Sequence, residues 1–307
     1  PPRSTLFPYT TLFRSRFSPS YSMSSIGNGL PREPRAPTDR NGFMDRETSQ
    51  HDSPPGIIQV EDLSLGYGER VVLEHMTFSI RKGEIVSILG GSGCGKSTLM
   101  KALIGLLKPL KGRIFLEGNE ITGSGGDAAL ALARRRIGVL FQSGALIGSL
   151  SLGENVALPV QEFSRLSPEM IQDLVRLKLE LVGLDGFEDY LPSELSGGMR
   201  KRAALARAMA LDPAILFCDE PSAGLDPVTS AELDELLLEL NRSLGITMVV
   251  VTHELPSIER ISQRSIMLDG EARGIIAVGP PDALRSENRD PRVQAFFHRQ
   301  TRPQGSR

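Results

Sequence analysis

GGSGCGKST, residues 90–98, is the stretch of this chain that decides its fold. It fits the pattern G-x-x-x-x-G-K-[ST], and it lies between a strand-like run, EIVSILG (84–90), and a helix-like run, STLMKALIGLL (97–107). A simple glycine-rich turn needs no such context, whereas a phosphate-binding loop does. Glycines let backbone N–H groups close around phosphate oxygens, and the N-terminus of the following helix adds favourable partial charge.

This loop therefore predicts a site for nucleotide phosphates and Mg²⁺. Lys96 is expected to reach the β- and γ-phosphates, and the hydroxyl of Ser97 is expected to bind Mg²⁺. The whole loop is predicted to contact the nucleotide: Gly90, Gly91, Ser92, Gly93, Cys94, Gly95, Lys96, Ser97 and Thr98.

A second strand-like run, AILFCDE (214–220), ends in two carboxylates. Open α/β sheets bind ligands at the carboxyl ends of their strands, so these side chains are expected beside the phosphate loop. Asp219 is predicted to orient Mg²⁺ through water, and Glu220 to polarise the attacking water. Strands often end in acids, but the pairing with a phosphate loop about 120 residues earlier makes the signal specific.

Composition excludes several other classes of protein. The chain has 307 residues, of which 40% are apolar and 23% charged, and its formal net charge is −2. Such a balance does not favour nucleic acid as a partner, and none is expected. Two cysteines, Cys94 and Cys218, are too few for a disulfide scaffold, and no apolar run approaches the roughly 20 residues of a membrane span.

The first 56 residues differ from the rest, because they hold nine of the 21 prolines and show no apolar periodicity. We expect a disordered tail over 1–56. Within it, LFPYTTLFRS (6–15) is the in-frame translation of a widely used sequencing adaptor, which indicates an assembly artefact; a native tail is the alternative. The folded domain is expected over 57–300, with a short second tail at 301–307.

Buried strand-like runs alternate with helix-like runs over most of the folded part, which predicts an α/β fold with a largely parallel sheet. Residues 143–212 are mostly helical in pattern and interrupt this alternation, so they are interpreted as an inserted helical subdomain. Ser230 is expected to cap an amphipathic helix over 230–245. The expected strands are 57–68, 71–80, 84–90, 113–118, 135–142, 214–220, 246–254 and 264–270.

LSGGM at 195–199, followed by RKRAALARAMA, adds a third motif. With the two preceding motifs, it makes the chain resemble an ATP-binding subunit of the ABC transporter family, in which the signature usually reads LSGGQ. The resemblance implies a RecA-like core, an antiparallel β subdomain, ATP hydrolysis with Mg²⁺, and a homodimer. It also implies that Ser196, Gly197 and Gly198 bind the γ-phosphate held by the opposite subunit. A helix cap made by Ser196 is compatible with that role.

The same resemblance assigns the remaining site residues. It implies that Tyr67 stacks on adenine, although a packing role at a strand end is the alternative. Gln142 matches the loop that senses Mg²⁺ and the permease, and His253 matches a histidine that contacts the γ-phosphate. AGLD (223–226) matches a loop whose Asp226 crosses the dimer interface. The implied catalytic residues are Glu220, His253 and Lys96, and the implied Mg²⁺ ligands are Ser97, Gln142 and Asp219.

Four further strings are similar to the ATPases of Mla/MCE-type lipid transport systems. They are FQSGAL (141–146), LGENVALP (152–159), PSELSGGMRKRAALARA (192–208) and DPRVQAFF (290–297). This similarity implies phospholipid transport between bacterial membranes, at the cytoplasmic face of the inner membrane. The implied partners are a permease docked on 143–160, an MCE-domain lipid-binding protein and sometimes a small STAS-domain protein.

The sequence also leaves alternatives to this function. Related transporters handle sterols, other hydrophobic compounds or small solutes. A soluble ABC ATPase usually carries large insertions or two fused domains, and a regulatory module that does not hydrolyse ATP would not need both Glu220 and His253. Cys94 and Cys218 are interpreted as small packing residues rather than as a redox switch.

Overall fold

The structure is a computed structural model that describes residues 56–123 and 126–298. The predicted tails and the string at 6–15 lie outside the described residues. No helix within the described ranges combines the length and the apolar character that a membrane crossing requires.

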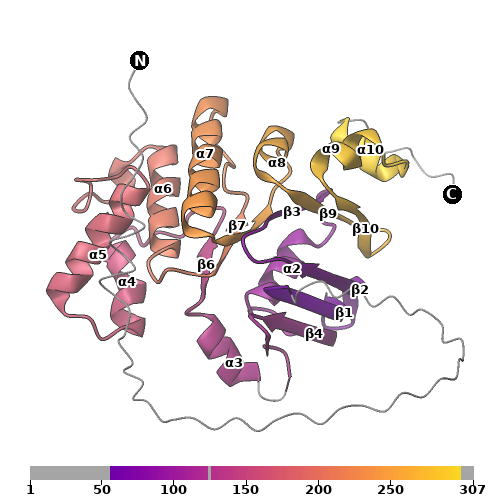
Figure 1. The fold of residues 1–307 in the computed structure, drawn as a ribbon, viewed down its shortest axis with the longest axis horizontal. Helices are drawn as coiled ribbons and strands as arrows, with labels where there is room; N and C mark the ends of the chain where they lie inside the picture. The colour runs from indigo at the N-terminus through magenta and orange to yellow at the C-terminus, as the bar shows by residue number, and fades with distance from the viewer. Residues whose placement is uncertain (1–55, 124–125, 299–307) are drawn as a thin grey trace, which may run out of the picture. The chain divides into compact units, whose positions relative to one another are not determined.

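A six-stranded sheet forms the centre of the described chain (Figure 1). Its strand order is β10-β9-β3-β8-β7-β6; β10 pairs antiparallel with β9, and the other neighbours pair in parallel. The predicted α/β fold with a largely parallel sheet is therefore confirmed. The strands are β3 (Ile85–Gly90), β6 (Ile137–Leu140), β7 (Ile215–Asp219), β8 (Thr247–Val251), β9 (Arg264–Asp269) and β10 (Gly274–Gly279).

A second sheet is antiparallel and has the strand order β2-β1-β4-β5. The first two strands are joined by a tight turn at Gly68, whose φ is +57°. This is the antiparallel subdomain that the family resemblance implied. Its strands are β1 (Ile58–Tyr67), β2 (Arg70–Ile80), β4 (Lys111–Leu116) and β5 (Asn119–Glu120).

The central strands are apolar throughout because both faces of the sheet are covered. In β7, Ile215 and Phe217 pack into a core shared with the antiparallel sheet, whereas Leu216 and Cys218 pack into a second core. This alternation is the two-residue period of a strand. The second core contains residues of the 143–212 region together with residues of β3, β6, β7 and β8, so these four strands connect the two halves of the domain.

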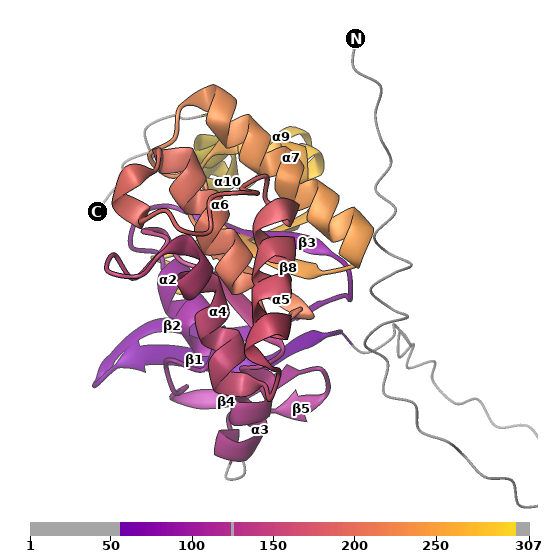
Figure 2. The same ribbon diagram turned by 90° about the vertical axis from the view of Figure 1, so that its left-hand side faces the viewer.

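Helices dominate residues 143–212, and they contact one another (Figures 1 and 2). Each α-helix begins with a serine that accepts a hydrogen bond from the first turn, and these serines are Ser151, Ser167 and Ser196. The first helix starts only at Leu152, so residues 143–151 form a loop. The elements are α4 (Leu152–Phe163), α5 (Pro168–Leu181), the 3₁₀ helix η1 (Pro192–Glu194) and α6 (Gly197–Ala208).

Two predicted helices differ in their bounds. The helix after the phosphate loop ends at Leu103 rather than 107, because Gly105 adopts a φ of +72°. The helix expected over 230–245 begins at Pro227, and its cap is Asp226 instead of Ser230. The other helices of the described chain are α2 (Lys96–Leu103), α3 (Gly126–Ala133), α7 (Pro227–Leu244), α8 (Leu255–Ile261), α9 (Pro281–Ser286) and α10 (Pro291–Phe297).

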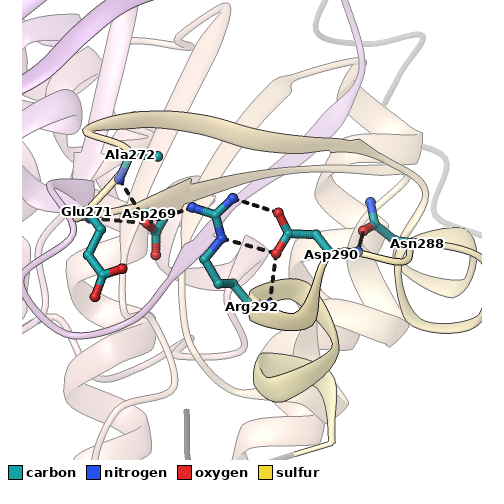
Figure 3. A network of polar contacts seen from close by, with 6 residues as sticks. All are labelled: Asp269, Glu271, Ala272, Asn288, Asp290 and Arg292. Atoms are coloured by element: carbon teal, nitrogen blue, oxygen red, sulfur yellow. Dashed lines mark hydrogen bonds and ion pairs between the residues drawn. The ribbon is translucent and has the colours of Figure 1, made fainter. Parts of the chain in front are cut away.

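The last helix is attached to the end of β9 by a polar network (Figure 3). Arg292 of α10 donates to Asp269 Oδ1 over 3.2 Å and to both oxygens of Asp290. Asp269 is buried and also accepts the backbone N–H groups of Glu271 and Ala272. A buried carboxylate is stable only when it is hydrogen-bonded, so this network fixes α10 next to the strand that borders the phosphate loop.

Candidate functional site

The phosphate loop connects β3 to α2 and has the backbone that a phosphate cradle requires. Gly90, Gly93 and Gly95 have φ values of +145°, +76° and +105°. A Cβ at Gly95 would lie 2.8 Å from Cγ of Leu73, so only glycine fits there. The first turn of α2 receives no side-chain cap, which leaves its N–H groups available to an anion.

Lys96 folds back over this loop. Its Nζ donates to the carbonyl oxygens of Gly90 and Gly91 over 2.9 and 3.0 Å. The same ammonium charge acts on Asp219 across the site. Ser97, next in the chain, is exposed at the start of α2. The predicted phosphate and Mg²⁺ groups thus converge on the loop.

Asp219 ends β7 in a partly buried position. Burial raises the pKa of its carboxyl group, the adjacent Glu220 charge raises it further, and Lys96, Lys101 and Lys201 act in the opposite direction. A carboxylate held beside another in a desolvated place fits a cation. No cluster of three or more His, Cys, Asp or Glu side chains suited to a metal occurs in the described chain. Asp219 is the carboxylate predicted to orient Mg²⁺, an ion that typically binds one or two carboxylates together with water and substrate phosphates.

Glu220 follows in a strained backbone conformation, with a φ of +45°. Its N–H donates to Val251 O over 2.7 Å, and its Oε1 lies 2.7 Å from Nδ1 of His253. Its Oε2 is buried and has no hydrogen-bond partner among the described residues. A buried acceptor without a partner is unusual, and the predicted role of Glu220 toward the attacking water remains a prediction.

A cavity of about 580 Å³ adjoins Asp219. Gln142, which follows β6, lines it together with Asp219 and Gly224. The structure thus brings together Gln142, Asp219 and part of the loop at 223–226.

The signature residues take no part in lining this cavity. Ser196 is exposed and caps α6, since its Oγ accepts the N–H of Met199 over 3.2 Å. A Cβ at Gly198 would lie 2.5 Å from Cγ2 of Thr229, so this glycine allows α6 to approach α7 closely. Contact between the signature and a nucleotide on an opposite subunit remains a prediction.

Asp226 has a structural role in addition to the predicted one. It caps α7 by accepting the N–H groups of Val228 and Thr229 and the hydroxyl of Thr229. The Thr229 side-chain hydrogen bond is the main reason why the pKa of Asp226 is lowered. Tyr67, at the end of β1, is half-exposed at 50%, and its stacking on adenine also remains a prediction.

Both cysteines are buried, as packing residues are. Burial raises the pKa of the Cys94 thiol and raises that of Cys218 to about 12. A thiol that resists ionisation is a poor nucleophile, so neither group has the properties of a redox switch.

Sequence reasoning missed three polar side chains that hold the loops of the site. Lys201 donates to Gln142 O, and Arg207 donates to Gly144 O and Ala145 O. Asn155 is fully buried and bonds the backbone of Ile147, Leu150 and Ser151. Burial lowers the pKa of both Lys201 and Arg207. The available signal was the cationic run RKR at 200–202, but it does not show which cation turns inward.

Known proteins resemble the chain over most of its described length. Residues 73–223 match the ABC transporter family. The ATP-binding protein MlaF of an intermembrane phospholipid transport system in Escherichia coli is 39% identical over 80% of this chain and 90% of its own length. A probable ribonucleotide transport ATP-binding protein, mkl, of Mycobacterium leprae is 40% identical over 80% of this chain and 70% of its own.

Solved structures of ABC transporter components are also similar to this chain. A dimeric ATP-binding cassette bound to ADP and phosphate after hydrolysis is 32% identical, with a TM-score of 0.66 over 73% of this chain and 98% of its own. A component of an ABC transporter complex from Clostridium perfringens is 31% identical, with a TM-score of 0.69 over 76% of this chain and 92% of its own. The chain therefore belongs to the ABC transporter family, as one of its ATP-hydrolysing subunits.

Proposed function

We propose that this ATPase powers the transport of phospholipid between bacterial membranes through a separate permease. The observation that carries the proposal is the match to MlaF, which extends over 90% of that protein's length. The mkl relative, whose name concerns ribonucleotides, is matched over 70% of its length. The strings at 141–146, 152–159, 192–208 and 290–297 support an Mla/MCE-type lipid transporter over a small-solute importer.

The proposed catalytic mechanism follows from the positions of the side chains. Lys96 and the glycine-rich backbone hold the phosphates, and Glu220, oriented by His253, accepts a proton from the attacking water. Ser97, Gln142 and Asp219 would hold Mg²⁺, which neutralises developing phosphate charge. His253 is 64% exposed and can therefore approach the γ-phosphate while it orients Glu220.

ABC cassettes form dimers, and we infer a head-to-tail homodimer for this chain. Each ATP would lie between the phosphate loop of one subunit and Ser196, Gly197 and Gly198 of the other. ATP would then stabilise the closed dimer, and hydrolysis would release it, because a ligand shifts an equilibrium only by its differential affinity.

The permease is proposed to dock on residues 143–160. In this segment Ile147 and Leu158 are exposed apolar side chains, whereas Asn155 is buried and holds the loop through the backbone of Ile147. An MCE-domain protein and a small STAS-domain protein are the further partners proposed, at the cytoplasmic face of the inner membrane. Movement of Gln142 would connect the ATP site to this docking segment.

Purification of the full chain with its membrane permease tests the proposal. We expect the complex to retain phospholipid, identified by mass spectrometry of extracted lipid, and to hydrolyse ATP faster than the isolated chain. The Glu220→Gln variant serves as the control that assembles without turnover. A complex that retains a polar solute such as a ribonucleotide, and no lipid, would reject phospholipid as the cargo.

A further inference from the structure

Lys201 is a buried cation whose bonds end on two loops of the ATP site. Its Nζ donates to Gln142 O over 2.6 Å and lies 3.3 Å from Glu220 O, and the residue is only 7% exposed. A buried ammonium group requires acceptors, and here both are main-chain carbonyls from distant parts of the sequence. One side chain of α6 therefore joins the backbone of the glutamine loop to the backbone of Glu220.

The contact with Glu220 holds its backbone. Glu220 has the strained φ of +45°, and a strained residue persists only where its surroundings hold it. Its N–H is held by Val251 O, and its carbonyl by Lys201. With both sides of the residue fixed, the carboxylate is directed toward His253 at 2.7 Å.

The same helix begins with the signature. Ser196 caps α6, and Lys201 is the fifth residue of that helix, less than one and a half turns further along. A short helical segment is rigid, so displacement of Ser196 would be transmitted to Lys201. In the proposed dimer, Ser196 contacts the ATP of the opposite subunit, whereas Lys201 contacts the catalytic loop of its own subunit.

We propose that Lys201 is a positioning residue that couples the two ATP sites of the dimer. Occupation of one site by ATP fixes the opposing α6, and Lys201 then fixes Glu220 and the Gln142 loop in the second site. This inference rests on the proposed head-to-tail dimer. It adds a physical link through which each subunit responds to the nucleotide of its partner.

Two neighbouring cations on α6 show what is particular to Lys201. Arg207 holds the glutamine loop at Gly144 O and Ala145 O but makes no bond to Glu220. Arg202 donates to Val182 O and to Glu232, both away from the ATP site. Arg202→Met is therefore a matched control that removes a cation from the same helix without touching the proposed link.

The experiment measures ATP hydrolysis against ATP concentration for the full chain in complex with its permease. Lys201→Met should reduce the Hill coefficient from its wild-type value toward 1, because a coupling of about 5- to 150-fold in ATP affinity between the two sites is lost. It should also lower kcat, because the backbone of Glu220 is no longer held. Affinity for the first ATP should be retained, because the phosphate loop is unchanged. Lys201→Arg should restore both quantities, since it retains charge and donors, and Arg202→Met should leave both unaffected.

Lys201→Gln guards against simple misfolding, because it keeps a neutral donor and is expected to fold with a near-native melting temperature. A Lys201→Met variant that folds with a near-native melting temperature and keeps the wild-type kcat and Hill coefficient would overturn the inference. A wild-type complex that hydrolyses ATP with a Hill coefficient of 1 would also overturn it, while leaving the proposed transport function standing. A wild-type complex that carries no lipid would reject the proposed cargo instead, without affecting the coupling measurement.

Discussion

Glu220 and His253 form a hydrogen-bonded pair, with Oε1 of the carboxylate 2.7 Å from Nδ1 of the imidazole. The second carboxylate oxygen is buried and has no hydrogen-bond partner among the described residues. One oxygen is thus held by His253, and the other is an unpaired acceptor at the end of β7. The pair lies at the ends of adjacent strands, β7 and β8, so the parallel sheet itself sets the separation.

Lys96→Ala tests the phosphate cradle. The substitution removes the ammonium that bonds Gly90 O and Gly91 O and would contact the phosphates. Loss of hydrogen bonds to a charged group costs about 1.5–3 kcal/mol, which corresponds to about tenfold to hundredfold weaker ATP binding. Equilibrium binding of a fluorescent ATP analogue measures this effect. Unchanged affinity would show that Lys96 does not contact the bound phosphates.

Tyr67 tests the predicted adenine contact. Stacking of a base on an aromatic ring contributes about 1–3 kcal/mol, so Tyr67→Ala should weaken ATP binding roughly 5- to 100-fold. Tyr67→Phe keeps the ring and should bind like the wild type. If both variants bind ATP normally, Tyr67 only packs at the end of β1, which is the alternative that the sequence left open.

Arg292→Met tests the attachment of α10 to the domain. The substitution removes the hydrogen bonds to the buried Asp269, and it should lower the free energy of unfolding by about 1–3 kcal/mol. Arg273→Met removes an exposed ion pair with Glu74 and should cost about 0–1 kcal/mol. Chemical denaturation of both variants gives the comparison. An equal loss of unfolding free energy in the two variants would mean that the Arg292 network stabilises the protein no more than an exposed ion pair does.

Asp234 provides a test by pH. This carboxylate is buried, accepts a hydrogen bond from Ser257 over 2.7 Å, and has a raised pKa whose main cause is burial. A group whose folded pKa exceeds its unfolded value makes the folded state less stable once the pH rises above the folded pKa. Asp234→Asn keeps the acceptor and should raise the melting temperature at pH 7 to 8. The advantage should shrink as the pH falls through the raised pKa toward the unfolded value of 3.8. An advantage that does not vary with pH would contradict this explanation.

The sequence predicted the five parallel strands of the central sheet because they are largely buried and read as apolar runs. The antiparallel edge strand β10 was not predicted. Short elements were missed: β5 spans only Asn119–Glu120, and α9 and α10 have six and seven residues. Such elements depend on tertiary packing more than on local pattern. The start of α7 was readable in principle, because Asp226 followed by Pro227 is a typical N-cap and first helical residue.

The candidate site was predictable where a motif fixes the backbone, as at Gly95 and Lys96. Lys201 was not, because it stands between Arg200 and Arg202 in a cationic run, and only the packing of α6 decides which one turns inward. The sequence likewise does not show where the side chain of Met199 lies. Its side chain packs against the core of the helical region, so Met199→Gln replaces an apolar contact there even if the phosphate contacts come from Ser196 and the glycines.

The most direct test of the catalytic account is the ATPase rate of the Glu220→Gln variant. The change keeps the size of the side chain and its possible bond to His253, but it removes the charge that accepts a proton from water. Turnover should fall by roughly 10²–10⁴, the contribution of a positioned general base. ATP affinity should be retained, and an ATP-bound dimer should accumulate in size-exclusion chromatography. Hydrolysis at the wild-type rate would show that Glu220 is not the catalytic carboxylate.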